Sequence, residues 1–164
     1  MKTLKNAVET IFNIADLHPQ ISARYYGDNI KIDDPQTAQY PLLHVEPTNS
    51  TVDVGTMNIG LNITLVDMPS IDDLSSLESQ NKTLQILNDV IGDFTMNYTF
   101  KQYKVEQPIT IVPIIAPEFN DRLVGWSAEL TIIVEYKKTG CSDNIINLST
   151  GEFSSAFSNA FNTI

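Results

Sequence analysis

The chain is short of cysteine and of positive charge. Its 164 residues include one cysteine, Cys141, and ten Lys or Arg against twenty Asp or Glu, which gives a formal net charge of −10. A single cysteine excludes an internal disulfide and a cysteine-rich metal site. Binding to nucleic acid or to an anionic membrane surface needs clustered basic side chains, so this composition predicts no specific nucleic-acid binding and no membrane binding.

Long hydrophobic runs are also missing. No apolar stretch is long enough to span a bilayer, and residues 1–18 are amphipathic, unlike the continuous apolar centre of a secretory signal. We therefore expect a protein of a cytosol-like compartment, or of a particle assembled there. Apolar residues make up 42% of the chain and charged residues 18%. This balance is typical of a globular protein, and the length suits one domain.

Residues that carry catalysis are few. His18 and His44 are the only histidines, and they are interpreted as a helix-end and a structural strand histidine. The sequence has no phosphate-binding glycine loop, nucleophile elbow or His-Glu metal motif. A nucleophile at Cys141 would need a histidine brought from a distant part of the chain. We expect no enzyme activity, no cofactor and no bound metal.

Two acidic pairs could serve a partner or simply face solvent. Asp72 and Asp73 begin an expected helix, where the helix dipole favours negative charge. Asp33 and Asp34 lie in a polar connector. They are interpreted as a solvated loop, with metal or partner binding as the alternative, although the spacing and glycine of an EF-hand are absent.

The strongest pattern lies in residues 123–136, LVGWSAELTIIVEY. Apolar side chains occupy every second position, and mostly polar ones alternate with them, which predicts a long strand with one buried and one wet face. Six residues of the buried face precede Tyr136, namely Val124, Trp126, Ala128, Leu130, Ile132 and Val134. A strand of this length can extend beyond its own domain and reach a neighbouring subunit.

The remaining elements follow from periodicity and turn residues. Helical spacing predicts an amphipathic helix over 3–17, capped by Thr3, and a second helix of some six turns that follows Ser70. The apolar positions of the second helix are Leu74, Leu77, Leu84, Leu87, Ile91 and Phe94. Strands are expected at 23–26 and 30–33, forming a small hairpin, and at 40–46, ended by Pro47. Residues 51–66 predict one strand with a β-bulge near Gly55. The prolines in 98–115 predict a strand that lies at a sheet edge or bends.

This order, α-β-β-β-α-β-β, predicts an α+β fold in which two helices cover one face of a twisted antiparallel sheet. Residues 1–140 form the expected domain. Residues 141–164, here called the C-terminal arm, are poor in charge. Three phenylalanines recur in the arm at helical spacing, and we expect it to dock on its own domain or on a partner. They are Phe153, Phe157 and Phe161.

Three stretches carry a resemblance to a known family. They are GDNIKIDDPQTAQYPLLHVEP (27–47), TMNIGLNITLVDM (56–68) and FNDRLVGWSAELTIIVEY (119–136). Together with the order of the elements, they resemble the tail-terminator proteins of tailed phages, also called tail-completion or tail-to-head joining proteins. The resemblance covers residues 3–136 and does not include the C-terminal arm.

The resemblance implies a virion protein that forms a ring, usually of six copies, caps the tail tube, ends its polymerisation and joins it to the head side. Its partners would be its own copies, the tail tube protein and the head-tail connector or portal-side proteins, with DNA passing through the lumen unbound. The implied contacts lie in two loops, one with Asp33 and Asp34. The other holds Phe119, Asn120, Asp121 and Arg122.

Two alternatives stay open. A neck or connector ring of a short-tailed phage would use the same kind of subunit, and the C-terminal arm would suit it. A small non-viral domain that binds a ligand or ion would show the same periodicities and would be a monomer.

Overall fold

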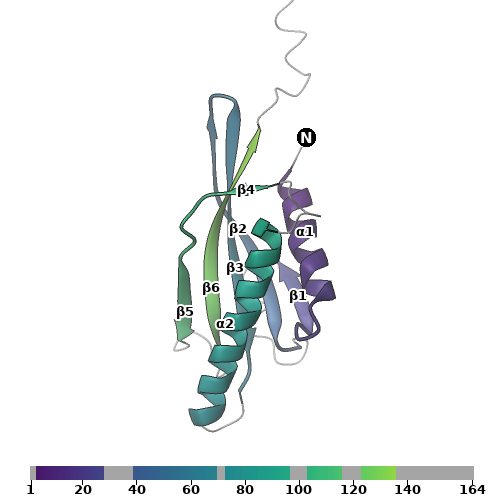
Figure 1. Cartoon of the computed structure of the whole chain (residues 1–164), viewed down its shortest axis with the longest axis vertical. Helices are drawn as coiled ribbons and strands as arrows, with labels where there is room; N and C mark the ends of the chain where they lie inside the picture. Colours follow the sequence, from purple (N-terminus) through teal and green to yellow (C-terminus); the bar gives the residue numbers. More distant parts are fainter. Residues whose placement is uncertain (1–2, 28–38, 70–72, 97–102, 116–122, 136–164) are drawn as a thin grey trace, which may run out of the picture.

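The computed structural model describes residues 3–27, 39–69, 73–96, 103–115 and 123–135. The expected α+β fold is confirmed: within these ranges a six-stranded sheet lies against two helices (Figure 1). The elements are α1 (Leu4–Leu17), β1 (Ala23–Tyr26), β2 (Leu42–Asp53), β3 (Thr56–Asp67), α2 (Asp73–Met96), β4 (Lys104–Val105), β5 (Ile111–Ile115) and β6 (Val124–Glu135).

The sheet is mostly antiparallel and open. Its strand order is β1-β2-β3-β6-β4, and β5 also pairs with β6. The one parallel pair joins β1 to β2, from Ala23 opposite Leu42 to Tyr26 opposite Val45. The described partner of β1 is thus β2, and the hairpin predicted from 23–26 and 30–33 stays a prediction. Residues 30–33 are outside the described part of the chain.

The long strand predicted at 123–136 is observed as β6 and lies inside the sheet. All twelve residues of β3 pair with it, from Thr56 opposite Glu135 to Asp67 opposite Val124. On its other side β5 pairs with the first part of β6 and β4 with the last. Four residues of the predicted inner face are buried, namely Ala128, Leu130, Ile132 and Val134.

In residues 40–66 the strands end and begin at other residues than the sequence predicted. β2 does not end at Pro47; it continues to Asp53, with a register shift between Pro47 and Ser50. β3 then begins at Thr56. The change of phase near Gly55 is therefore a tight hairpin turn between two strands, and the bulge predicted there lies instead near Pro47. Gly55 takes a φ of 78°, which side chains other than glycine rarely adopt.

Both helices cover the same face of the sheet (Figure 1). Thr3 caps α1 as predicted, in a capping box with Asn6. Ala7, Val8, Ile11, Ile14 and Ala15 are the buried residues of α1. They pack in one core with Ile86, Leu87, Val90, Ile91 and Phe94 of α2 and with the inner face of β3 and β6.

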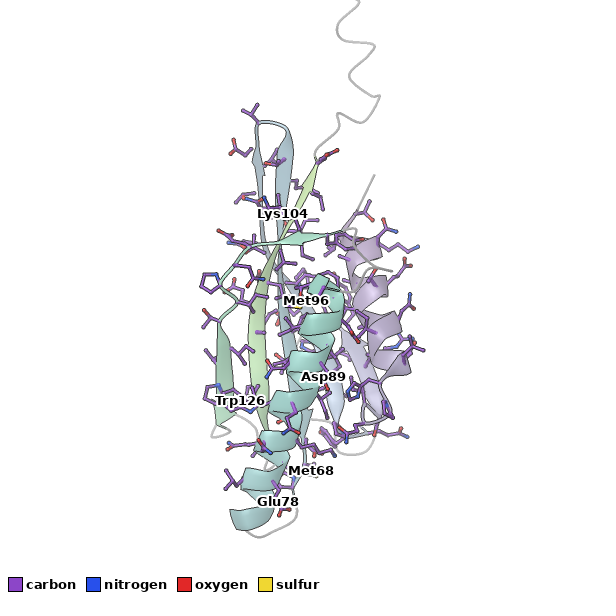
Figure 2. The ribbon with its side chains drawn as sticks, in the orientation of Figure 1. Met68, Glu78, Asp89, Met96, Lys104 and Trp126 are labelled. Carbon is purple, nitrogen blue, oxygen red and sulfur yellow. The ribbon has the colours of Figure 1, made fainter. Side chains whose placement is uncertain are left out.

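The first turns of α2 extend past the core (Figure 1). Leu77, predicted as an apolar contact, is 63% exposed because it lies beyond the inner residues of the sheet. Further along the helix, the indole Nε1 of Trp126 donates a hydrogen bond of 2.9 Å to the backbone oxygen of Gln80 (Figure 2). Trp126 packs against the core, as predicted, and also ties β6 to α2.

Two glycines offer a matched test of how closely β3 and β6 approach. A methyl group at Gly125 would overlap the backbone oxygen of Leu65, whereas one at Gly92 of α2 would meet nothing within 4 Å. We expect Gly125→Ala to lower the free energy of unfolding by about 2–3 kcal/mol, because the backbone must shift to admit the methyl group. Gly92→Ala should raise it by about 0.5–1 kcal/mol, because alanine favours the helix.

Urea denaturation followed by circular dichroism measures both changes. A Gly125→Ala protein as stable as the wild type would contradict the close approach of the two strands.

Candidate subunit interface and an outer-face pocket

The predicted contact residues all lie outside the described ranges. These are Asp33, Asp34, Phe119, Asn120, Asp121, Arg122, Phe153, Phe157 and Phe161. Their roles therefore remain predictions. The described residues instead present two features that the sequence did not single out: a projecting hairpin and a pocket on the sheet face away from the helices.

The end of the β2–β3 hairpin projects beyond both helices (Figure 1). We call residues 46–58 the hairpin tip. It forms because β2 and β3 are each twelve residues long, or about 40 Å at 3.3 Å per residue, more than the helices cover. Every residue of β2 from Pro47 to Asp53 is exposed. Val52 and Val54 are 63% and 98% exposed, so the tip presents apolar side chains to solvent.

One border of the hairpin tip is open. The amide of Gly27 donates to the backbone oxygen of Val45, at 3.2 Å, and the β1 register ends at the same residue. From Glu46 to Asp53, no strand of the described chain pairs with this side of β2. Pro47 has no N–H to offer, but beyond it alternate residues keep their N–H and C=O groups available, which is the geometry that allows another strand to add to a sheet.

The opposite border of the sheet is formed by β4 and β5, which both pair with β6. The amide of Glu106 donates to the backbone oxygen of Thr131, at 2.9 Å. The backbone N–H and C=O groups of Thr131, and of every second residue along β6, therefore point towards this border. Trp126 belongs to the other set of residues, whose backbone N–H and C=O groups point towards β3. Pro113 is opposite Trp126, so its backbone nitrogen points away from β6. The missing N–H of this proline therefore breaks no hydrogen bond between β5 and β6. In the described residues 103–115, the one strand expected from the sequence is two short strands, β4 and β5, and both lie at the sheet edge beside β6.

The pocket lies on the face of the sheet opposite the helices. Its volume is about 280 Å³. The residues that line it are Thr48, Asn62, Thr110, Val112, Ser127 and Glu129. Four of the six belong to one block of the sheet, because Asn62 is opposite Glu129 and Val112 is opposite Ser127.

A short hydrogen-bond chain supports the floor of the pocket. Ser127 Oγ donates to Asn62 Oδ1 at 2.5 Å, and Thr64 Oγ1 lies 3.0 Å from Ser127 Oγ. A serine hydroxyl has one proton, so Thr64 is the donor in the second bond. Thr64 is only 5% exposed. The chain of bonds therefore holds Ser127 and Asn62 in place from beneath.

The two histidines lie where the sequence placed them, His44 within β2 and His18 at the end of α1. His44 is fully buried, its Nε2 contacts the backbone oxygen of Gly27, and its ring stacks on Tyr25 at a centroid distance of 6.0 Å. His18 lies at the end of α1, with Nε2 3.6 Å from a carboxylate oxygen of Asp89. Tyr103 stacks on Phe94, and burial raises the pKa of its phenol.

The described residues show neither a cluster of metal ligands nor a membrane-spanning helix. They contain no group of three or more His, Cys, Asp or Glu side chains placed to hold a metal ion. Among the same residues, neither helix has the length and apolar character needed to cross a membrane.

The pocket floor yields a test by double-mutant cycle. Ser127→Ala leaves the buried hydroxyl of Thr64 without its acceptor, so we expect a loss of about 1–2 kcal/mol in the free energy of unfolding. Thr64→Val should cost a similar amount. The double variant should lose less than the two single losses added together, because both remove the same bond.

Glu129→Gln is the control, because an exposed carboxylate on the same strand should change stability by less than about 0.5 kcal/mol. Chemical denaturation measures all four variants. Strictly additive losses would contradict the bond between Thr64 and Ser127.

Comparison with known proteins adds no relative. No model of a protein family matches the chain, and a search of curated proteins found no similar sequence. The function is therefore inferred from the chain's own residues and from the resemblance of its three stretches.

Proposed function

We propose that this chain is a ring-forming virion protein, a tail terminator that caps the tail tube of a phage and joins it to the head or neck. The observation that carries the proposal is the hairpin tip, which combines an open strand border with exposed Val52 and Val54. The sequence resemblance of residues 27–47, 56–68 and 119–136 supports it independently.

The two borders of the sheet are unlike, and this favours a ring. One border is formed by β1 and the open side of β2, and the other by β4 and β5. A contact that joins unlike surfaces is head-to-tail, and repeated head-to-tail contacts close into a ring when the rotation between copies allows it. Strand borders left open in a monomer are the surfaces that such contacts can cover.

In this proposal the copies contact one another through the hairpin tip, and six of them form the ring. One face of the ring binds the tail tube protein and stops its growth, and the other meets the connector or portal-side proteins. Residues 33–34 and 119–122 are the proposed contacts with these neighbours. The net charge of −10 per chain would let DNA pass through the lumen without binding, because like charges repel.

The hairpin tip should decide the state of assembly. We expect the double variant Val52→Glu and Val54→Glu to shift the protein from rings towards the 18.3 kDa monomer, because two carboxylates cannot be buried in an apolar contact without partners. Its thermal midpoint measured as a monomer should change little, since both side chains are already exposed. Light scattering coupled to size-exclusion chromatography measures the mass.

The matched control is Leu17→Glu with Leu77→Glu. These two residues are 78% and 63% exposed and lie on the helices, so the control adds the same charge away from the tip. It should assemble like the wild type. Equal loss of assembly in both double variants, or full assembly of the tip variant, would argue against the tip as the contact.

The C-terminal arm gives a second test. We expect a chain that ends at residue 140 to stay folded, because the core residues of the described sheet and helices lie between Ala7 and Val134. We also expect it to assemble more weakly, because the arm's three phenylalanines would contact a neighbour. Circular dichroism and light scattering separate the two effects. An unfolded truncated chain would show that the arm belongs to the domain.

A further inference from the structure

We propose that the outer-face pocket binds a guanidinium group, the side chain of an arginine on a partner protein. This inference does not depend on whether copies of the chain form a ring, although one lining residue, Thr48, belongs to the hairpin tip. It rests on the shape of the pocket, on the hydrogen-bond acceptors that line it, and on a carboxylate that has no counter-ion within the described chain.

Five of the six residues that line the pocket carry side-chain oxygen acceptors. They are two threonines, Ser127, Asn62 and Glu129, whose side chains offer hydroxyl, amide and carboxylate oxygens. Glu129 forms no ion pair within the residues that the structure describes. A guanidinium group carries a positive charge and five N–H donors, so it can meet several acceptors at once.

The pocket is held in shape before any ligand arrives. Its floor belongs to β3 and β6, which pair along their whole length. Thr64 fixes Ser127, and Ser127 fixes Asn62, through the bonds of 3.0 and 2.5 Å. A site whose acceptors are already oriented loses less conformational entropy on binding.

One wall depends on a glycine. At the irregularity between Pro47 and Ser50, residues 48 and 49 lie over Gly60 of β3. A methyl group at Gly60 would overlap the hydroxyl of Thr48 and would lie 2.7 Å from the backbone oxygen of Asn49. The absence of a side chain at this position therefore allows Thr48 to form the side of the pocket nearest β2.

The lining favours arginine over lysine. A carboxylate can accept two parallel hydrogen bonds from a guanidinium, and a lysine ammonium offers only a point charge. Val112 is 50% exposed and gives the pocket an apolar wall. The flat face of a guanidinium is weakly hydrated and packs well against such a surface. The chain's excess of acidic residues also attracts cations over distance.

Methyl signals provide a direct assay that works for the full chain, in a large assembly as well. Three lining residues carry methyl groups, namely Thr48, Thr110 and Val112. We expect titration with N-acetyl-L-argininamide to shift the methyl signals of these three residues in a saturable way. The neutral isostere N-acetyl-L-citrullinamide should shift none of them, and N-acetyl-L-lysinamide should bind more weakly than the arginine amide.

Glu129→Gln should weaken binding of the arginine amide about threefold to fivefold, as expected for a partly exposed charge pair. Added salt should weaken it in the wild type more than in this variant. The matched control is Glu78→Gln, which removes the same charge from an exposed position on the first turns of α2 (Figure 2). It should bind like the wild type.

Three results would overturn the proposal. They are the absence of saturable shifts at the methyl groups of Thr48, Thr110 and Val112, equal binding of the citrulline and arginine amides, and equal weakening by Glu78→Gln and Glu129→Gln. Tighter binding of the lysine amide than of the arginine amide would overturn the choice of guanidinium. Each of these results is independent of whether the protein forms rings.

Discussion

The pairing of β3 with β6 along their full length is the interaction on which the other features depend. All twelve residues of β3 have a partner on β6, from Thr56 to Asp67. Because side chains alternate between the two faces of a strand, this one ladder creates both an apolar wall for the helices and a polar face on the other side. Gly125 belongs to the same contact, since a side chain there would meet the backbone of Leu65.

The length of this ladder also produces the surface proposed for assembly. The helices cover only part of the strands (Figure 1). The remaining part of β2 and β3 forms the hairpin tip, whose exposed Val52 and Val54 and open border contribute nothing to the core. The outer-face pocket arises from the same strands, with Gly60 admitting Thr48 on one side and β5 closing the other. A single ladder thus positions the core, the tip and the pocket.

Much of the fold was predictable because its signals are local. Helical spacing identified α1, and alternation identified β6 and its inner face. Pairing partners depend on residues far apart in the chain, so the parallel contact of β1 with β2 was not predicted. At Val54 and Gly55 the alternation of apolar and polar residues changes phase, which is the pattern of a two-residue turn between two strands. Interpreting this change of phase as a bulge hid the hairpin tip. The pocket joins three strands and has no local signal.

The central claim is that copies of this chain close into a ring through their sheet borders. Negative-stain electron microscopy of the purified protein, with native mass spectrometry of the same sample, tests it most directly. The account predicts annular particles whose mass is six times that of the 18.3 kDa chain. A protein that stays monomeric at every concentration, with and without tail tube protein present, would contradict it.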